Sequence, residues 1–494
     1  MKSIRLTISR FDPELDDRPR LESYTVEIHE GARVLHAIQA VRDEIDPTLS
    51  YRHSCNVGQC GSCAIRVNGK PVMACKEEAT GGMVVEPLRL PVVKDLITDL
   101  EPLLESVAPF VPRGEADPPT RVETESIKPL RNCLQCFTCV SVCPMLDVAE
   151  FAGPTAMRQK MRLALDPRDA GDRIPEAVEA GLFHCTSCQA CRIACPEEIA
   201  TPALAIEKLR ALAVERGYTF PKHLEFARLV RETGRSIELP GPRFLERVSG
   251  VVEPVTAARC TVALFTGCLY DLVMPETAFD AVEVMRRNGI RVVIPKDQVC
   301  CGSPLIRTGQ TGLVAGLKEK NIGIFSRLSV DAVVTLCAGC GTTLKNDYET
   351  PFEVLDITQI LVRQGIEPPA RLPLTVTYHD PCHLLHGQGI REEPRALIRQ
   401  AAELVEMPAW CCGSGGGVRA AFPGEAKALA LQRRDEIEKT GAESVVSVCP
   451  FCEFHLGEHT GMRIQNVCTL LMEGYREKDR SGRSDESLML NPLI

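Results

Sequence analysis

The spacing of the cysteines constrains this chain more than any other feature of its sequence. There are 24 cysteines in 494 residues, and all but Cys260 and Cys468 fall into regularly spaced groups. Regular spacing is typical of metal ligands, whereas cysteines that fill a core are scattered. Disulfides are not expected, because the N-terminus has no signal-peptide pattern and reducing compartments keep thiols free. We therefore expect a metalloprotein in which Cys260 and Cys468 are structural.

The first cysteine group lies in residues 1–100, which we expect to form a small mixed domain. Strands are predicted at 4–11 and 23–28 and a helix at 32–45, and Asn68-Gly69 predicts a hairpin turn. The pattern Cys-x4-Cys-x2-Cys, with a fourth cysteine beyond the hairpin, is the plant-type [2Fe–2S] spacing. Zinc is disfavoured because it prefers paired Cys-x2–4-Cys knuckles. The expected [2Fe–2S] ligands are Cys55, Cys60, Cys63 and Cys75.

The second group lies in residues 101–237, after a proline-rich arm. Two copies of Cys-x2-Cys-x2-Cys-x3-Cys-Pro follow the arm, and the segments around them have the apolar spacing of helices. We therefore expect an all-α domain with two [4Fe–4S] cubanes. In two-cluster ferredoxins the fourth cysteine of each run ligates the other cluster. The expected ligand sets are Cys133, Cys136, Cys139 and Cys195 for one cubane and Cys143, Cys185, Cys188 and Cys191 for the other.

The third group belongs to an internal repeat. After a linker at 238–260, strands and helices alternate in two α/β halves, 261–370 and 371–474, and a polar tail at 475–494 is expected to be disordered. Equivalent cysteines recur after 114, 111 and 112 residues, each after a strand, where α/β sheets bind ligands. The ten cysteines are Cys268, Cys300, Cys301, Cys337, Cys340, Cys382, Cys411, Cys412, Cys449 and Cys452.

Five cysteines in each half exceed the four ligands of a tetrahedral metal site. A disulfide between adjacent cysteines would strain the backbone. A larger iron–sulfur assembly, in which one thiolate bridges two irons, fits the number better. The turn "GSGGG" after Cys412 lacks the lysine of a phosphate-binding loop, so we expect its glycines to bring backbone close to an inorganic cluster.

Both halves of the chain resemble known families. The pattern Cys, Cys-Cys-Gly, Cys-x2-Cys is similar to that of the CCG-domain family, which includes a heterodisulfide reductase subunit with a non-cubane [4Fe–4S] cluster at each intact motif. The segments "DPTLSYRHSCNVGQCGSCAIRVNGKPVMAC" and "RLALDPRD" resemble the iron–sulfur subunit of succinate dehydrogenase and fumarate reductase. That resemblance implies an N-terminal β-grasp ferredoxin domain. Cys188 stands where respiratory members usually lack a cysteine, which implies a [4Fe–4S] rather than a [3Fe–4S] centre.

The two halves in this order resemble the thiol:fumarate reductase family. The resemblance implies that coenzyme M and coenzyme B thiols are oxidised at the ten CCG cysteines. Electrons then pass through the cubanes and the [2Fe–2S] cluster to FAD on a separate flavoprotein subunit, which reduces fumarate to succinate. We see no G-x-G-x-x-G at a strand–helix junction, so we expect the flavin only on that partner.

Two other functions are compatible with the motifs. The chain could transfer electrons in a quinone-linked succinate dehydrogenase, with the CCG half as a wiring or docking module. A bare scaffold is disfavoured because all ten CCG cysteines are retained.

Histidines surround one CCG cysteine in "YHDPCHLLHG". We take His383 as a candidate catalytic residue that relays a proton or orients a thiol. The alternative, which we favour, is a hydrogen bond to cluster sulfur or a helix cap, since histidines beside metal ligands often serve that way. His455 and His459 show no HExxH pattern and are expected to be surface or packing residues.

The charge and hydropathy of the chain bear on its partners. A net charge of −9 argues against nucleic acid as a partner. No apolar run reaches the roughly 18–20 residues that span a bilayer. We expect a cytoplasmic protein, with any membrane contact made through a partner.

Overall fold

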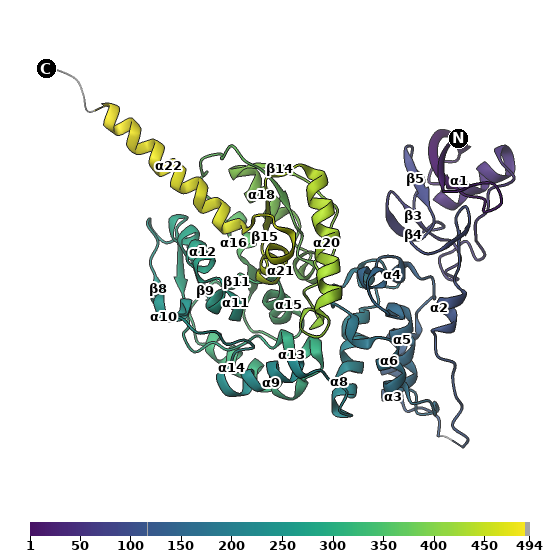
Figure 1. Cartoon of the computed structure of the whole chain (residues 1–494), viewed down its shortest axis with the longest axis horizontal. Coiled ribbons are helices and arrows are strands. Elements are labelled where there is room, and N and C mark those ends of the chain that lie inside the picture. Colours follow the sequence, from purple (N-terminus) through teal and green to yellow (C-terminus); the bar gives the residue numbers. More distant parts are fainter. Residues whose placement is uncertain (116, 490–494) are drawn as a thin grey trace. The chain divides into compact units, whose positions relative to one another are not determined.

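The computed structural model describes residues 1–115 and 117–489, and the chain folds into two units (Figure 1). Unit 1 comprises Met1–Leu182 and Gln189–Ala213, and unit 2 comprises Phe183–Cys188 and the residues from Val214 onward. The short Phe183–Cys188 loop, which carries Cys185 and Cys188, therefore belongs with the C-terminal half of the chain.

A five-stranded mixed sheet with one helix forms the N-terminal part of unit 1. Its strand order is β2-β1-β5-β3-β4, and β1 buries Leu6 and Ile8 in the same core as Ile38 of α1. Asn68 and Gly69 have φ values of 50° and 77°, as a type I′ turn requires, so the predicted hairpin is confirmed. The elements are β1 (Lys2–Arg10), β2 (Arg20–Ile28), α1 (Val34–Ala40), η1 (Val41–Ile45), β3 (Ala64–Val67), β4 (Lys70–Met73), β5 (Met83–Glu86), β6 (Val92–Lys94) and β7 (Ile97–Thr98).

Helices form the rest of unit 1. The central helix is α5 (Gly153–Ala164), of which ten of 12 residues are buried, and it packs against α3, α4 and α6. Thr120 and Glu123 form a reciprocal capping box that begins α3. The remaining elements are α2 (Glu101–Glu105), α3 (Arg121–Arg131), α4 (Thr138–Ser141), η2 (Pro144–Asp147), α6 (Arg173–Glu179), η3 (Leu182–His184), α7 (Ala190–Ile193), η4 (Pro202–Ile206) and α8 (Glu207–Glu215). Of these, η3 and α8 each cross the boundary into unit 2.

Unit 2 contains the repeat. The first sheet has the order β12-β11-β9-β10-β8 and the second the order β14-β13-β15-β16. Strands β9 to β12 correspond in order to β13 to β16, and within each of these sets the pairs are parallel. The strands are β8 (Val251–Val252), β9 (Cys260–Phe265), β10 (Ile290–Val293), β11 (Ala332–Thr335), β12 (Val354–Asp356), β13 (Thr375–Tyr378), β14 (Glu403–Val405), β15 (Ser444–Ser447) and β16 (Ile464–Asn466). The two predicted halves therefore share one topology.

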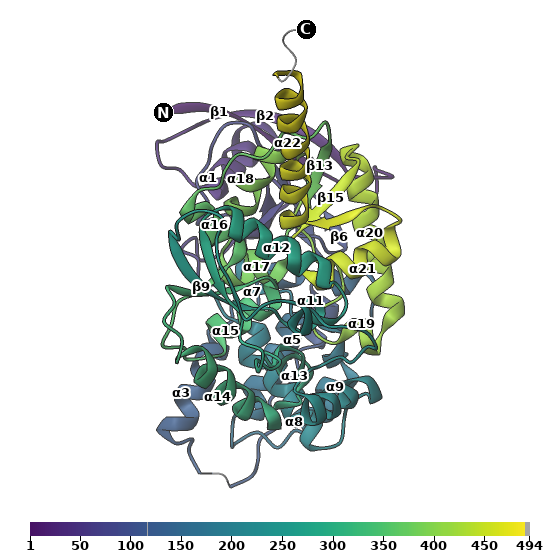
Figure 2. The same cartoon turned by 90° about the vertical axis from the view of Figure 1, so that its left-hand side faces the viewer.

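The two halves of unit 2 pack into one hydrophobic core through exchanged helices. The last helix of the first half, α16, packs on α18 of the second half. The last helix of the second half, α22, packs on α12 of the first half, as Figures 1 and 2 show. The helices after the first strands do the same, since α11 contacts α21 and α17 contacts α15. This exchange fixes the two cysteine sets relative to each other.

The helices of unit 2 lie between and around these strands. They are α9 (Pro221–Thr233), α10 (Phe244–Arg247), α11 (Cys268–Leu272), α12 (Pro275–Arg287), α13 (Ser303–Thr308), η5 (Thr311–Leu313), α14 (Val314–Phe325), α15 (Ala338–Asn346), α16 (Ile357–Gln364), α17 (Cys382–Gln388), α18 (Glu392–Ala401), α19 (Val418–Ala421), α20 (Pro423–Thr440), α21 (Pro450–Thr460) and α22 (Val467–Met489).

Two expectations about the ends of the repeat need correction. The expected linker at 238–260 contains α10 and the edge strand β8, which pairs antiparallel with β10. The expected disorder is wrong for 475–489, which continue α22; residues 490–494 lie outside the described part. Contacts with the first half hold this helix, since Tyr475 accepts a hydrogen bond from Asn288 and Arg476 pairs with Asp280 at 2.7 Å.

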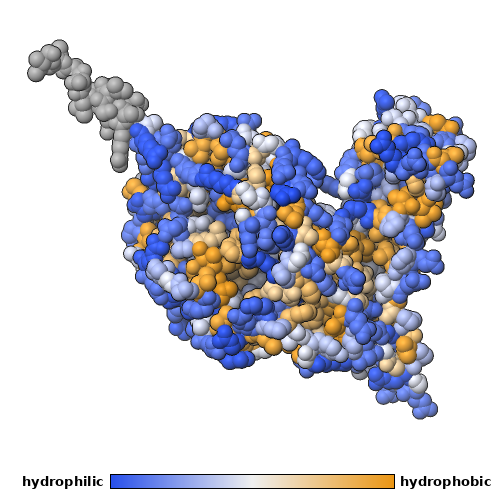
Figure 3. All heavy atoms as spheres, viewed as in Figure 1, coloured by the Kyte–Doolittle hydropathy of each residue, from blue (hydrophilic) through white to orange (hydrophobic). Residues whose placement is uncertain are grey.

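The visible surface of unit 2 is mostly hydrophilic, with smaller apolar patches (Figure 3). Among the described residues, no helix has both the length and the apolar character that crossing a membrane demands.

Candidate functional site

All ten CCG cysteines follow the carboxyl ends of parallel strands. In the first half, Cys268 opens α11 after β9, the Cys300-Cys301 pair follows β10, and Cys337 caps α15 after β11. The second half repeats this arrangement around α17, β14 and α21. Ligand sites of parallel α/β sheets lie at this edge.

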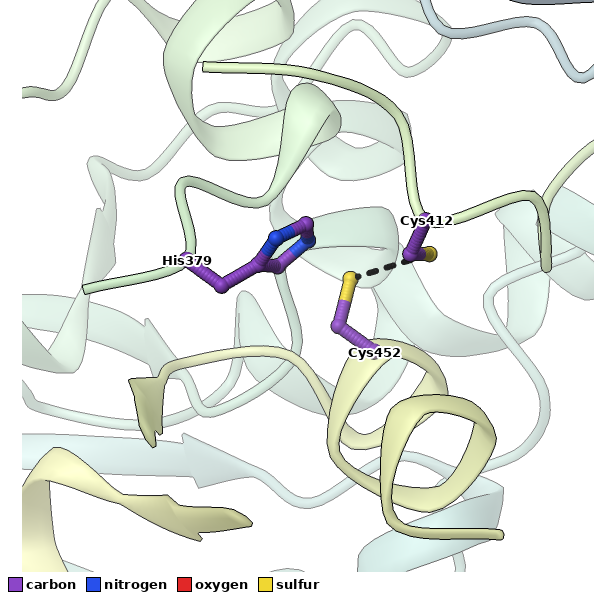
Figure 4. A group of neighbouring side chains, drawn as sticks. All are labelled: His379, Cys412 and Cys452. Carbon is purple, nitrogen blue, oxygen red and sulfur yellow. Dashed lines mark hydrogen bonds between the residues drawn. The ribbon is translucent and has the colours of Figure 1, made fainter. Parts of the chain in front are cut away.

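Neighbouring thiols interact in the same order in each half. That order is Cys268, Cys300, Cys301, Cys340, Cys337 in the first half and Cys382, Cys411, Cys412, Cys452, Cys449 in the second. The Sγ atoms of Cys412 and Cys452 are 3.4 Å apart (Figure 4). The two sets of cysteines meet where the thiols of Cys337 and Cys449 interact.

The pKa lies well below its usual value for the second cysteine of each vicinal pair and for Cys449. A hydrogen bond from Cys300 holds the pKa of Cys301 well below its usual value, and one from Cys411 does the same for the pKa of Cys412. Four of the five cysteines in each set are buried and the fifth is half-buried. Such closely spaced thiols cannot all ionise unless cations bind among them. This donor set fits an iron–sulfur centre in each half, because iron would supply that positive charge.

One cavity of about 770 Å³ opens over both cysteine sets. Nine of the ten CCG cysteines line it, and Cys411 is the exception. Four cationic side chains also contribute to the lining: Lys222, Arg307, Arg419 and Lys427. Asp347 pairs with Arg307 and Glu458 with Arg419, while Lys427 is exposed. The cavity can therefore hold an anionic molecule whose reactive end reaches sulfur.

Histidines add polar contacts in the second half. Nδ1 of His383 lies 3.7 Å from the sulfur of Cys382, and its Nε2 has no hydrogen-bond partner among the described residues. Burial lowers the pKa of His383 to about 4, so the ring is neutral. His379, which the sequence reading did not single out as a site residue, faces Cys412 and Cys452 (Figure 4), and in the described structure neither of its nitrogens is hydrogen-bonded.

The glycine-rich turn at 413–417 packs against the loop that carries Cys185 and Cys188. A Cβ on Gly416 would lie 2.3 Å from the backbone oxygen of Cys185, and one on Gly415 would lie 2.6 Å from that of Thr186. His386 donates from Nδ1 to the carbonyl oxygen of Cys188 at 2.9 Å. The glycines therefore permit close backbone contact, but with the neighbouring cysteine loop rather than only with a cluster.

The [2Fe–2S] motif of unit 1 forms a loop whose N–H groups point at sulfur. The sulfur of Cys55 accepts from the N–H groups of Val57, Gln59 and Cys60, at 3.5, 3.3 and 3.3 Å. These bonds lower the pKa of Cys55 to about 6. The sulfur of Cys60 accepts from the N–H of Cys55 at 3.5 Å, and the thiols of Cys63 and Cys75 interact with each other. Such a loop suits a thiolate-bound cluster near the surface.

The first cubane motif surrounds a buried arginine. Arg158 of α5 is 2% exposed and donates to the sulfur of Cys133 at 3.2 Å. Its charge also acts on Cys139 and Cys195, so the structure brings the expected fourth ligand to this set. The sulfur of Cys139 is 3.1 Å from the Thr155 hydroxyl, and that of Cys136 is 3.3 Å from the Thr138 hydroxyl.

The remaining cysteines are placed as follows. Of the second expected cubane set, Cys143 and Cys191 belong to unit 1 and Cys185 and Cys188 to unit 2, so their grouping stays a prediction. Cys260 is half-buried in β9, and Cys468 is fully buried in α22.

Three sequence families match the chain. Residues 5–105 match a family described as a 2Fe-2S iron-sulfur cluster binding domain, and residues 129–199 match a 4Fe-4S dicluster domain. Residues 262–345 and 376–457 match the cysteine-rich domain called CCG. These matches confirm the predicted succession of iron–sulfur domains.

Relatives match individual parts of the chain as well as its whole length. The chain is similar to the fumarate reductase iron-sulfur subunit of Mycobacterium tuberculosis, with 34% identity over 43% of this chain and 94% of that protein. It is 30% identical to a subunit of the dihydromethanophenazine:CoB–CoM heterodisulfide reductase of Methanosarcina acetivorans, over 66% of this chain and 88% of that subunit. A subunit of the fumarate reductase (CoM/CoB) of Methanothermobacter marburgensis is 39% identical, over 96% of this chain and 100% of that subunit. The chain therefore belongs to the family of this fumarate reductase (CoM/CoB) subunit and is an iron–sulfur electron-transfer subunit of an oxidoreductase.

Proposed function

We propose that this chain oxidises two anionic thiols, coenzyme M and coenzyme B, to their mixed disulfide in the cavity of unit 2. The observation that carries the proposal is a cavity lined by cysteines of both CCG motifs and by cationic side chains. Two thiols release two protons and two electrons when they form one disulfide. Fumarate takes up two of each to become succinate, so the two half-reactions balance.

The cofactors we assign are one [2Fe–2S] cluster, two [4Fe–4S] cubanes and one non-cubane [4Fe–4S] cluster at each CCG motif. The five sulfurs of each motif would hold that cluster. When bound, such clusters would supply one-electron carriers beside the thiols.

The chain's own residues bind and orient the substrates. Lys427 is exposed and offers its ammonium group to a sulfonate or phosphate, while apolar side chains such as Phe226 and Phe451 line the cavity. The neutral His383 ring offers its unpaired Nε2 to a thiol proton, while Nδ1 stays with Cys382. The two roles considered for His383 are therefore compatible.

Electrons leave the cavity on the side of the second motif. Cys411 hydrogen-bonds the hydroxyl of Thr186 at 3.5 Å, and Gly416 packs on Cys185. We infer that electrons pass through this contact to the Cys185–Cys188 loop, and then to the partner flavoprotein, which carries FAD and reduces fumarate. We place the complex in the cytoplasm, with any membrane contact made by a partner.

The second candidate is electron transfer in a quinone-linked succinate dehydrogenase. The observation in its favour is the similarity of 43% of the chain to a fumarate reductase iron-sulfur subunit. In that case the CCG half would conduct electrons or dock a partner without binding thiols.

Rapid mixing of the anaerobic complex with each donor distinguishes the two candidates. We expect coenzyme M plus coenzyme B to reduce the clusters, and we expect Cys301→Ser or Cys412→Ser to abolish that reduction. A menaquinol analogue is the competing donor. Cluster reduction by the quinol alone would replace our proposal with the second candidate.

A further inference from the structure

The two CCG motifs are equivalent in their cysteines but not in the residues packed around them. Phe265 and His379 each stand three residues before the first cysteine of their motif. Asn321 and Arg433 each stand 16 residues before Cys337 or Cys449 of their own half. The first motif therefore has an aromatic ring and a neutral amide where the second has an imidazole and a guanidinium.

Arg433 is a buried cation that forms no salt bridge among the described residues. It is 1% exposed, its Nη2 donates to the Met407 thioether at 2.9 Å, and its Nε has no hydrogen-bond partner among the described residues. The nearby carboxylate of Asp380 is engaged by Arg395, at 2.9 and 2.7 Å. Burying a charge is costly unless an opposite charge accompanies it.

The sulfurs of the second motif can supply that negative charge. The guanidinium of Arg433 interacts electrostatically with Cys411 and Cys412. His379 faces Cys412 and Cys452 with ring nitrogens that bond to no other described group (Figure 4). Both side chains are therefore available to a negatively charged, thiolate-bound centre.

The corresponding residues of the first motif do not offer free polar groups to its cysteines, because the side-chain amide of Asn321 is hydrogen-bonded to backbone groups. The amide of Asn321 donates to the carbonyl oxygens of Val299 and Cys300 and accepts from the N–H of Val299. Phe265 offers no hydrogen bond. Arg307 in the first half and Arg419 in the second each pair with a carboxylate, at 2.6 and 2.7 Å. These two arginines therefore add no difference in charge between the motifs.

One negative group opposes this difference. Glu453, which follows Cys452, has Gly341 as its counterpart after Cys340. The Glu453 carboxylate accepts hydrogen bonds from Tyr270 and Asn466, at 2.6 and 2.8 Å, which disperse part of its charge. Glu436 also acts electrostatically on Arg433, but it pairs with a lysine at 2.6 Å. We therefore expect the positive contribution of the buried guanidinium to exceed the negative contribution of Glu453.

We propose that Arg433, supported by His379, gives the centre at the second CCG motif a higher reduction potential than the centre at the first. Each one-electron reduction adds one negative charge, which a nearby buried cation stabilises. Electrons taken up at either motif then collect at the second, whose Cys411 contacts Thr186 of the neighbouring cysteine loop. The difference between the halves thus gives electron flow a direction.

The inference rests on the proposal that both motifs hold clusters, but not on thiol oxidation. It is tested by redox titration of the purified complex with chemical mediators, without thiols, followed by electron paramagnetic resonance and Mössbauer spectroscopy. Arg433→Gln removes the charge, Arg433→Lys retains it, and Arg434→Gln is the control at a partly exposed position of the same helix.

We expect Arg433→Gln to lower the reduction potential of one CCG centre by at least about 59 mV. For a one-electron couple this is a tenfold change in the ratio of reduced to oxidised centre. Arg433→Lys should retain most of the parental potential, and Arg434→Gln should leave both centres unchanged. Equal shifts at both centres, or no difference between Arg433→Gln and Arg434→Gln, would overturn the inference. Iron content is measured separately on the parent protein. If the second motif holds no iron, the cluster assignment itself is wrong, and this outcome is distinct from a missing shift in potential.

Discussion

Replacement of Gly416 by alanine tests the contact between the glycine-rich turn and the Cys185–Cys188 loop. Gly416 has a φ of +63°, and a Cβ there would lie 2.3 Å from the backbone oxygen of Cys185. The left-handed conformation alone costs a non-glycine residue about 1–2 kcal/mol. Overlap with fixed backbone adds about 1–3 kcal/mol, as overpacking does elsewhere.

Gly441 is the matched control for this variant. It ends α20 with a φ of +67°, and a Cβ added there would meet no other atom within 4 Å. Gly441→Ala therefore carries the conformational cost without the overlap. A difference of about 2 kcal/mol between the variants corresponds to about 4–8 °C in melting temperature for a domain of this size class.

Thermal unfolding and cluster reoxidation measure the two consequences. We expect Gly416→Ala to melt below Gly441→Ala by that margin, and fumarate to reoxidise its CCG centres more slowly. Equal melting temperatures and equal reoxidation rates for the two variants would refute the close contact as the route of electron exit.

Three further substitutions test other parts of the account. Arg158→Met should lower the reduction potential of the cubane that contains Cys133 by roughly 60 mV, about 1.4 kcal/mol for one electron, because it removes a charged hydrogen bond to sulfur. A redox titration that shows no shift would contradict this expectation. Lys427→Glu should raise the KM for the anionic thiols about three- to tenfold, since exposed ion pairs contribute up to about 1 kcal/mol. Lys439→Glu, at an exposed position of the same helix, is the control and should leave the KM unchanged. Cys412→Ser should lower the iron content of the complex by one cluster's complement, and unchanged iron would remove Cys412 from the ligands.

The sequence was sufficient for features set by local spacing. The cysteine motifs, the Asn68-Gly69 turn and the repeat of strands and helices in unit 2 all depend on residues close together in the chain. The tail could not be predicted in the same way. Its polar composition indicated disorder, but Tyr475 and Arg476 find partners in the first half, and such tertiary contacts leave no local signal.

Long-range contacts explain what the sequence missed at the site. The contact between Cys337 and Cys449 and the approach of Gly416 to Cys185 join segments far apart in the chain. His379 and Arg433 lack a motif of their own. Comparison of the two repeats position by position could have found them, because Phe265 and Asn321 stand at the equivalent places.

Product stoichiometry tests the central claim most directly. The anaerobic complex is given equal amounts of coenzyme M and coenzyme B with fumarate, and disulfide and succinate are both quantified. We predict one mixed disulfide for each succinate, with both products lost in Cys301→Ser and Cys412→Ser. Succinate formed without disulfide, or only when a quinol is supplied, would contradict thiol oxidation at the CCG cysteines.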